Sequence, residues 1–363
     1  MARHLHSGLF VHHPSSSNFH WGGCTRSLRP TGIHKLRMEV RNHNQGDANS
    51  LLEVSDLSIG INRPDGVLSL TDRVSFHLNQ GEVLGLIGES GCGKSITSLA
   101  IMGMLPEPGG TRLSGKIQFL EQDIFSLDEP GLNQLRGQKI SMIFQEPFAA
   151  MNPLIRIGDQ MLEVFDYHPA DFDHHQKIRH LLDEVGLTDH PRILQSYPHE
   201  LSGGMLQRIM IAMSLLLDPD LLIADEPTTA LDVTVQAQIM NLIVRLKRER
   251  KMSVLLISHN ISLMAQYTDR IAVMYAGQIV ESNHTESFLE EPKHPYSKGL
   301  MHAIPTLDQQ QRKIISIPGQ VPEPGKYQQG CRFKSRCIHA TDLCLSDPPE
   351  KTMPKEGRYR CHY

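Results

Sequence analysis

The residues from Gly88 to Ser95 have the types and spacing of a phosphate-binding loop. They read Gly-Glu-Ser-Gly-Cys-Gly-Lys-Ser, between an expected strand at Gly81–Ile87 and an expected helix at Ser95–Leu105. Glycine at 91 and 93 lets the backbone wrap an anion, and the helix directs its positive end at the same point. Lys94 should reach the β- and γ-phosphates, and the Ser95 hydroxyl should ligate Mg²⁺. The residues expected to bind Mg-ATP are Gly88, Glu89, Ser90, Gly91, Cys92, Gly93, Lys94, Ser95 and Ile96.

A second group of chemically active residues ends a short apolar stretch. Leu221–Ala224 is expected to be a buried parallel strand, and it delivers Asp225 and Glu226 at its end. Asp225 would hold Mg²⁺ through water, and Glu226 would orient or deprotonate the water that attacks the γ-phosphate. Two acidic residues after a strand are by themselves weak evidence for a catalytic site, because many strands end with acidic residues. Pro227, which stops the strand, and the earlier phosphate loop strengthen the interpretation.

The segment Leu201–Arg208 offers a second anion site, and it reads Leu-Ser-Gly-Gly-Met-Leu-Gln-Arg. Ser202 can cap a helix that begins at Gly203, and Gly203 and Gly204 expose N–H groups at the positive end of that helix. This end has no phosphate of its own to bind, because the phosphate loop already holds one. The segment resembles the signature motif of ABC ATPases. The resemblance implies that it closes over the γ-phosphate bound by another subunit, in a head-to-tail dimer with two ATPs between the chains.

Further residues match the same family in order along the chain. Gln145 resembles the Q-loop glutamine, Asp232 resembles the D-loop acid at the dimer interface, and His259 resembles the switch histidine that contacts the γ-phosphate. A lone histidine at a strand end is more often an ordinary polar residue, and the ordered series is what favours a functional role. The resemblance implies Glu226, His259 and Gln145 as catalytic residues, and Ser95, Gln145 and Asp225 as Mg²⁺ ligands.

Two positions depart from the family pattern. Ile59-Gly60-Ile61 stands where related proteins have an aromatic residue that stacks on adenine, so we expect aliphatic packing there. Asn260 stands after the switch histidine, where aspartate is usual, and the sequence offers no physical account of this change.

The elements that must position these residues alternate along the chain. The expected strands are Leu51–Ile61, Gly81–Ile87, Lys139–Phe144, Leu221–Ala224 and Ser253–Ser258. The expected helices are Ser95–Leu105, most of Gln160–Val185 with an interruption near Pro169, and Gly203–Leu217. This alternation predicts an α/β fold with a mostly parallel sheet, which the resemblance identifies as an ABC-type P-loop NTPase core.

Three regions are expected along the chain. Residues 1–50 would be a disordered N-terminal extension, or upstream sequence if translation starts at Met38. Residues 51–290 would be the ABC ATPase domain, with a helical subdomain at about 146–204 that touches membrane subunits. Residues 291–363 would be a small C-terminal extension that contains four cysteines.

The composition excludes several classes of protein. The chain has 363 residues with 39% hydrophobic and 21% charged residues, which is typical of a globular protein with a sizeable core. A formal net charge of −4 does not favour nucleic acid as a partner. The sequence contains neither an apolar run of the roughly 20 residues that span a bilayer nor a signal peptide. We therefore expect a cytoplasmic protein that relies on other subunits for any work in the membrane.

The region after residue 290 narrows the family. His294-Pro-Tyr296, Gly299–Pro305 and Ile317-Pro-Gly319 resemble the C-terminal extension of oligopeptide and dipeptide importer ATPases. The resemblance implies uptake of di- or oligopeptides by a complex at the cytoplasmic face of the inner (plasma) membrane. Its partners would be a second ATPase subunit, identical or paralogous, two permease subunits and an extracytoplasmic solute-binding protein.

Three alternative functions compete with this interpretation. Nickel importers share much of this extension. A soluble ABC ATPase of DNA repair or translation would show a long coiled-coil insertion or two cassettes in one chain, and neither is present. A binding module without hydrolysis would need a damaged Glu226 or His259, and both are intact.

Four cysteines, Cys331, Cys337, Cys344 and Cys361, lie in the last 33 residues of the chain. Four thiolates on one small segment suit a [4Fe–4S] cluster or Zn²⁺, and the peptide importers that this tail resembles carry an iron–sulfur cluster there. Zinc and no metal are the alternatives. Arg332, Lys334 and Arg336 could offset the cluster's negative charge or simply be solvated. The motifs that touch ATP all precede Asn260, so we expect ATPase activity to survive when Cys337→Ser removes the cluster.

Overall fold

The computed structural model describes residues 50–106, 109–168, 172–229, 231–302, 317–327 and 329–363. These residues all belong to one compact unit, Ala48–Tyr363. The expectation of disorder for residues 1–50 therefore falls almost wholly outside the described residues. The predicted boundary at residue 290 stays a prediction.

The centre of the fold is an eight-stranded sheet in the order β12-β13-β11-β10-β4-β9-β8-β7. Its strands are β4 (Val83–Ile87), β7 (Ile140–Ile143), β8 (Leu221–Asp225), β9 (Ser253–Ser258), β10 (Arg270–Tyr275), β11 (Gln278–His284), β12 (Glu350–Thr352) and β13 (Arg358–Arg360). The five strands from β10 to β7 are parallel, and every residue in them is buried. Burial on both faces explains why they read as continuous apolar runs, and the predicted parallel sheet is confirmed.

A second, antiparallel sheet was not expected from the sequence. It has the order β2-β1-β5-β6, and β3 also pairs with β1. Its strands are β1 (Ser50–Arg63), β2 (Gly66–Ser69), β3 (Val74–Asn79), β5 (Gly110–Phe119) and β6 (Gln122–Asp123). Apolar side chains from β1, β3 and β5 form one core with α2 and one face of the central sheet, including Leu57, Leu78, Leu86, Ile101 and Ile117.

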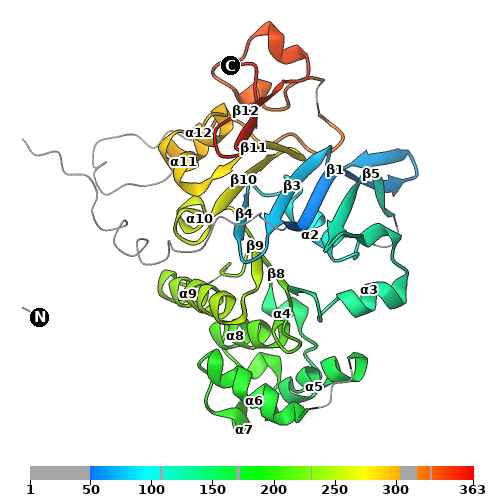
Figure 1. Cartoon of the computed structure of the whole chain (residues 1–363), viewed down its shortest axis with the longest axis vertical. Coiled ribbons are helices and arrows are strands. Elements are labelled where there is room, and N and C mark those ends of the chain that lie inside the picture. Colours follow the sequence, from blue (N-terminus) through cyan, green and yellow to red (C-terminus); the bar gives the residue numbers. More distant parts are fainter. Residues whose placement is uncertain (1–49, 107–108, 169–171, 230, 303–316, 328) are drawn as a thin grey trace, which may run out of the picture. The chain divides into compact units, whose positions relative to one another are not determined.

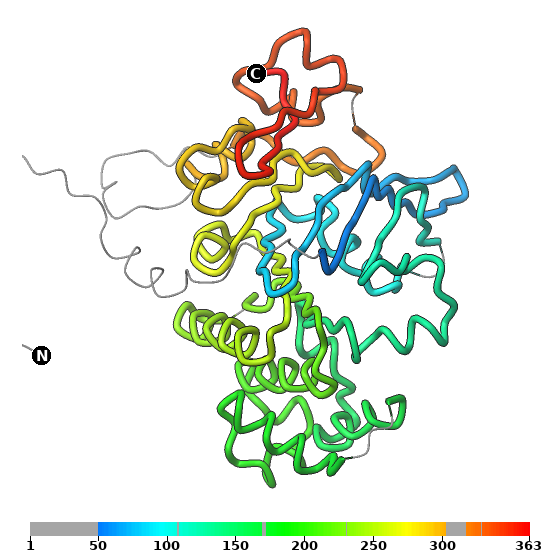
Figure 2. Tube along the Cα trace, in the orientation of Figure 1, coloured from blue at the N-terminus to red at the C-terminus, as the bar shows by residue number. Residues whose placement is uncertain are grey.

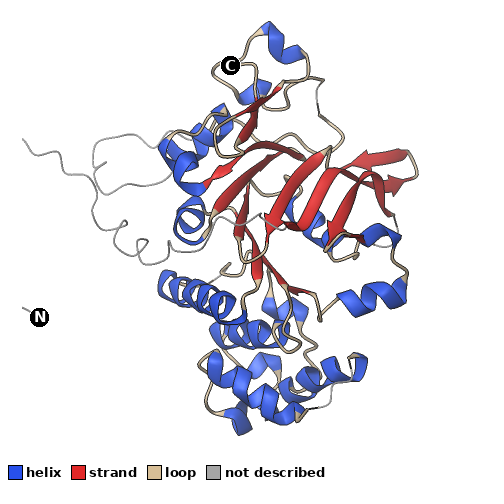
Figure 3. Ribbon diagram, viewed as in Figure 1, coloured by secondary structure: helices blue, strands red, loops and turns tan. Residues whose placement is uncertain are grey.

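Helices cover the central sheet and extend beyond its β7–β8 side (Figures 1 and 3). They are α2 (Lys94–Ile101), α3 (Glu129–Leu135), α4 (Pro147–Ala150), α5 (Ile157–Tyr167), α6 (His174–Glu184), α7 (His190–Gln195), α8 (Gly203–Ser214), α9 (Val233–Arg250), α10 (Ile261–Tyr267), α11 (Thr285–Glu290) and α12 (Pro295–His302). The helices α4 to α7 lie within residues 146–204, where the helical subdomain stays a prediction. The stretch Gln160–Val185, expected to be helical with one interruption, is two helices, α5 and α6, the second of which is capped by the Asp173 side chain. Among the described residues, none of these helices has the length and apolar character needed to cross a membrane.

The C-terminal extension is joined to the central sheet. Strand β13 pairs with β11, opposite Glu281 and Ser282, and β12 pairs with β13. Phe333 of the extension packs against Tyr275 of β10 and Tyr296 of α12, with ring centroids 5.2 and 5.5 Å apart. The trace of Figure 2 shows the orange and red segments folded back beside the yellow strands β10 and β11.

Candidate functional site

The predicted site residues lie at the carboxyl ends of four neighbouring parallel strands. The phosphate loop follows β4, His259 follows β9, Glu226 follows β8 and Gln145 follows β7, and these strands are adjacent in the order β4-β9-β8-β7. Ligands of open α/β sheets bind at this edge. The topology therefore brings together residues that are spread over nearly half of the chain, from Gly88 to His259.

The phosphate loop has the backbone that its glycines predict. Gly93 has a φ of 108° immediately before α2 begins at Lys94, a conformation that other L-residues rarely adopt. At Gly88 the constraint is space, because a Cβ atom there would lie 2.2 Å from the carbonyl oxygen of Met274. The loop thus turns sharply from strand to helix and leaves the N-terminus of α2 open to an anion.

Lys94 is almost fully buried within this loop. Its Nζ donates hydrogen bonds to the carbonyl oxygens of Gly88, at 2.8 Å, and of Glu89, at 3.1 Å. Burial raises the pKa of the neighbouring Cys92 thiol, although the positive charge of Lys94 opposes that effect. The loop therefore presents an ammonium group, held in place by its own backbone, beside a neutral thiol.

Asp225, at the end of β8, has the features of a metal carboxylate. Its side chain is buried, and its Oδ1 atom has no hydrogen-bond partner in the described structure. Burial raises its pKa, a hydrogen bond from Ser95 lowers it, and the adjacent Glu226 raises it. An unpaired buried carboxylate oxygen beside a serine hydroxyl is a hard oxygen donor set, which suits Mg²⁺. Asp225 and Ser95 therefore fit the expected metal.

Glu226 is the point at which the predicted catalytic residues meet. Its Oε2 accepts hydrogen bonds from Gln145 Nε2 at 3.3 Å and from Thr229 Oγ1 at 2.9 Å, and its Oε1 lies 3.1 Å from His259 Nδ1. Burial alone would raise the pKa of Glu226, but the hydrogen bonds from His259 and Thr229 lower it below its usual range. The group is therefore an ionised carboxylate, as a general base requires.

The backbone at Glu226 is also unusual. Its φ is +45°, in the left-handed region that few non-glycine residues occupy, and its N–H donates to the carbonyl oxygen of Ile257 at 2.9 Å. Thr229 was not predicted as a site residue. Thr229 lies three residues after Glu226, and its N–H donates to the Glu226 carbonyl oxygen, so the two residues belong to one turn. This spacing is the sequence signal that could have identified Thr229.

The signature segment begins α8 as predicted. The Ser202 Oγ accepts a hydrogen bond from Met205 N–H, and the nearest atom to an added Cβ at Gly203 would be Leu231 Cδ2, 4.0 Å away. This helix start is therefore open. Asp232 caps α9 by accepting a hydrogen bond from Val235 N–H at 2.9 Å. The roles of Ser202, Gly203, Gly204 and Asp232 across a dimer interface stay predictions.

The two departures from the family pattern now have structural explanations. Ile59 is fully buried in the core, so it is not available to pack on adenine. Asn260 caps α10, because its Oδ1 accepts hydrogen bonds from the N–H groups of Ser262 and Leu263. Asparagine is as effective an N-cap as aspartate, so this helix start is retained.

The four cysteines of the extension are neighbours but do not form a metal site in this structure. All four are free thiols, and each of Cys331, Cys337 and Cys361 is close enough to other members to be affected by their charge. Burial raises the pKa of Cys331 to about 11, and the other three thiols act in the same direction. Across the described residues no group of three or more His, Cys, Asp or Glu could hold a metal ion. The predicted iron–sulfur cluster is therefore not supported.

Nor are the nearby arginines arranged to offset a cluster's charge. Arg332 forms an ion pair with Asp72 at 2.7 Å, and Arg336 forms one with Glu89 of the phosphate loop at 2.9 Å. Tyr296 also contacts Glu89. Two residues that follow Asn260 therefore contact the phosphate loop, although the motifs expected to touch ATP all precede Asn260. No local sequence pattern indicated these contacts, because they join positions more than 200 residues apart.

Comparisons with known proteins agree with the fold and with the family resemblance. Residues 71–229 match the family described as ABC transporter, and residues 280–344 match the oligopeptide/dipeptide transporter C-terminal region. Among solved structures, the dimeric structure of MJ0796, a bacterial ABC transporter cassette, is 25% identical with a TM-score of 0.57. The match covers 64% of this chain and 98% of that one.

Curated relatives match over nearly their whole length. The oligopeptide transport ATP-binding protein OppD of Escherichia coli is 44% identical over 319 residues, which cover 87% of this chain and 94% of OppD. The dipeptide transport ATP-binding protein DppD of the same organism is 42% identical over 319 residues, covering 86% of this chain and 97% of DppD. The chain belongs to the oligopeptide/dipeptide transporter family of ABC ATPases.

Proposed function

We propose that this ABC ATPase hydrolyses Mg-ATP with Glu226 as the general base and that the hydrolysis drives uptake of di- or oligopeptides. The observation that carries the catalytic part is the convergence of Gln145, Thr229 and His259 on the ionised Glu226 carboxylate, directly after Asp225. The peptide assignment is supported by the relatives, which are named as oligopeptide or dipeptide transport proteins. The same names favour peptide over nickel as the cargo.

The chain's own residues account for the steps of hydrolysis. Lys94 and the N-terminus of α2 would bind the phosphates, and Ser95 and Asp225 would hold Mg²⁺, which supplies positive charge to the phosphate oxygens when bound. Glu226 would accept a proton from the attacking water, and Gln145 would help to orient that water. His259, whose side chain is 63% exposed, is free to contact the γ-phosphate while it stays within reach of Glu226.

The active form would be a head-to-tail dimer. The open start of α8 at Ser202–Gly204 would meet the γ-phosphate bound to the partner chain, and Asp232 would lie at the interface. The further partners would be two permease subunits and a solute-binding protein, with the ATPase on the cytoplasmic face of the membrane. The family match supports this assembly.

Transport in a reconstituted complex tests this proposal. The chain would be assembled with its permeases and binding protein in proteoliposomes, and ATP-dependent uptake of a labelled peptide would be measured beside uptake of nickel. We expect peptide uptake, and we expect its loss in Glu226→Gln but not in Glu249→Gln, an exposed acid on α9. Uptake of nickel alone would replace the peptide assignment with a nickel importer.

The four-cysteine segment carries a separate proposal, a [4Fe–4S] centre. Four thiols in one small segment support it, since binding to a metal would relieve the mutual repulsion of their ionised forms. It requires these cysteines to rearrange, because the described residues contain no group of three or more such side chains that could hold a metal ion. Protein purified without oxygen should hold about four iron atoms per chain and lose them in Cys337→Ser. One zinc per chain would instead indicate a structural zinc site. The absence of both iron and zinc would exclude a metal centre.

A further inference from the structure

The C-terminal extension makes a two-point contact with the phosphate loop at Glu89. The Glu89 N–H donates a hydrogen bond to Tyr296 Oη at 3.0 Å. The two carboxylate oxygens of Glu89 accept hydrogen bonds from Arg336, with Nη1 to Oε1 at 2.9 Å and Nη2 to Oε2 at 3.2 Å. Both the backbone and the side chain of this loop residue are therefore held by residues from beyond the cassette's own motifs.

Arg336 is itself held in place. Its side chain is only 5% exposed, its Nε donates to the Pro318 carbonyl oxygen at 2.8 Å, and its guanidinium lies 5.7 Å from the Tyr275 ring centroid. Two parallel N–H···O bonds from a buried guanidinium are the strong, geometrically specific form of ion pair. The pair thus differs from a surface salt bridge, which usually contributes little.

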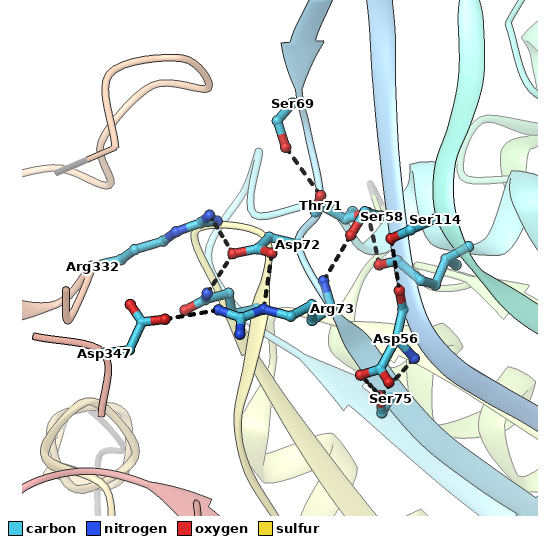
Figure 4. A network of polar contacts seen from close by, with 12 residues as sticks. Asp56, Ser58, Ser69, Thr71, Asp72, Arg73, Ser75, Ser114, Arg332 and Asp347 are labelled. Atoms are coloured by element: carbon cyan, nitrogen blue, oxygen red, sulfur yellow. Dashed lines mark hydrogen bonds and ion pairs between the residues drawn. The ribbon is translucent and has the colours of Figure 1, made fainter. Parts of the chain in front are cut away.

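A second set of contacts reaches the loop by way of Asp72, whose ion pair with Arg332 is drawn in Figure 4. Arg332 donates to Asp72 Oδ2 at 2.7 Å, and Asp72 N–H donates to the Gly277 carbonyl oxygen at 2.8 Å. Gly277 N–H in turn donates to the carbonyl oxygen of Cys92, within the phosphate loop, at 2.9 Å. Both Arg332 and Arg336 of the extension therefore connect to the loop, one by a short chain of hydrogen bonds and one directly.

The charge of Glu89 explains why such a contact matters. An ionised carboxylate in a loop that binds a triphosphate repels that ligand, and the repulsion is strong where water is partly excluded. Lys94 does not neutralise the carboxylate in this structure, because its ammonium bonds to loop carbonyl oxygens. The fork of Arg336 both neutralises the Glu89 carboxylate and fixes its direction.

We propose that Arg336 is a positioning residue for ATP binding, which pairs with Glu89 so that the loop presents N–H groups and Lys94, rather than a free carboxylate, to the phosphates. The proposal rests on the ATP site proposed above at Gly88–Ser95. It assigns to the C-terminal extension a direct effect on nucleotide affinity.

The test compares ATP KM and kcat in the full-length protein. Arg336→Gln should raise the ATP KM about tenfold and change kcat less than about twofold, because the lost charge-assisted pair acts on binding rather than on the proton transfer. Adding Glu89→Gln to Arg336→Gln should lower the KM again by most of that factor, since it removes the unpaired charge. Arg336→Lys keeps the positive charge but cannot form two parallel hydrogen bonds, so its ATP KM should lie between those of the unmodified chain and Arg336→Gln.

Controls separate this role from a loss of folding. Arg358→Gln removes another half-buried arginine of the extension, one that bonds to the Ser75 carbonyl oxygen, and it should leave the ATP KM unchanged. Thermal melting would be recorded for every variant. If Arg336→Gln does not fold, the same comparison is made between Arg336→Lys with and without Glu89→Gln.

Two results would overturn the proposal. One is an unchanged ATP KM in Arg336→Gln. The other is a raised KM that Glu89→Gln does not lower, because a merely structural role for Arg336 predicts no such rescue. A Lys94→Ala variant that binds ATP as tightly as the unmodified chain would instead refute the ATP site itself.

Discussion

Replacement of Glu226 by glutamine separates catalysis from structure at this site. The two side chains have nearly the same shape, so an amide oxygen in the place of Oε2 keeps the hydrogen bonds from Gln145 and Thr229. The amide NH₂ group then takes the place of Oε1, so only the hydrogen bond from His259 Nδ1 is lost. The loss of one hydrogen bond changes the free energy of unfolding by about 1 kcal/mol, so the variant should fold and bind nucleotide.

The effect on turnover should be much larger. General base catalysis contributes roughly 100- to 10,000-fold, and an amide does not accept the proton. We therefore expect kcat to fall at least ~100-fold, which corresponds to about 2.7 kcal/mol in the activation free energy. This fall in kcat is larger than the loss of one hydrogen bond can explain, so it would identify Glu226 as the general base.

The assay measures steady-state and single-turnover ATP hydrolysis together with equilibrium ATP binding. Glu249→Gln, the same change at an exposed position of α9, serves as the matched control and should keep normal turnover. A Glu226→Gln protein that binds ATP and turns over within about threefold of the unmodified chain would refute the role of Glu226 as general base.

Two further predictions follow from the same site. Thr229→Val removes a hydrogen bond that lowers the Glu226 pKa, so this pKa should rise. The acid limb of the kcat–pH profile should then move to higher pH. An acid limb that does not move would show that ionisation of Glu226 does not determine it. Ser202→Arg fills the open start of α8, so the variant should bind ATP yet fail to dimerise on ATP addition in light scattering, and an ATP-dependent dimer would contradict the assigned role of this segment.

The sequence predicted the phosphate loop and Glu226 because their signals are local. The loop needs only its own glycines and the strand and helix beside it, and Glu226 directly follows an apolar strand. The meeting of Gln145, Glu226 and His259 depends on strand order, which composition and periodicity do not contain. It was expected only through the family resemblance, and the adjacency of β7, β8 and β9 provides its physical basis.

Other features depend on contacts between distant segments. The antiparallel sheet requires β1 to pair with β5, about 50 residues later in the chain, and nothing in either strand specifies that register. Thr229 acts through one hydroxyl in a turn. The helix α9 was missed although its buried residues Ile239, Leu242, Ile243 and Leu246 recur at helical spacing, so its signal was local and was overlooked. For the antiparallel sheet and for Thr229, the information lies in tertiary packing rather than in local preference.

The position of Arg332 and Arg336 in the chain connects the extension's chemistry with the ATP site. Arg332 directly follows Cys331, and Arg336 directly precedes Cys337, so both arginines lie on the short segment between two of the four cysteines. A metal or a covalent bond that changed the spacing of these two thiols would act on the backbone that carries both arginines. From the sequence, ATPase activity was expected to survive the loss of a metal from this segment. Because Arg336 reaches Glu89 from this segment, a change of backbone between Cys331 and Cys337 would be passed directly to the phosphate loop.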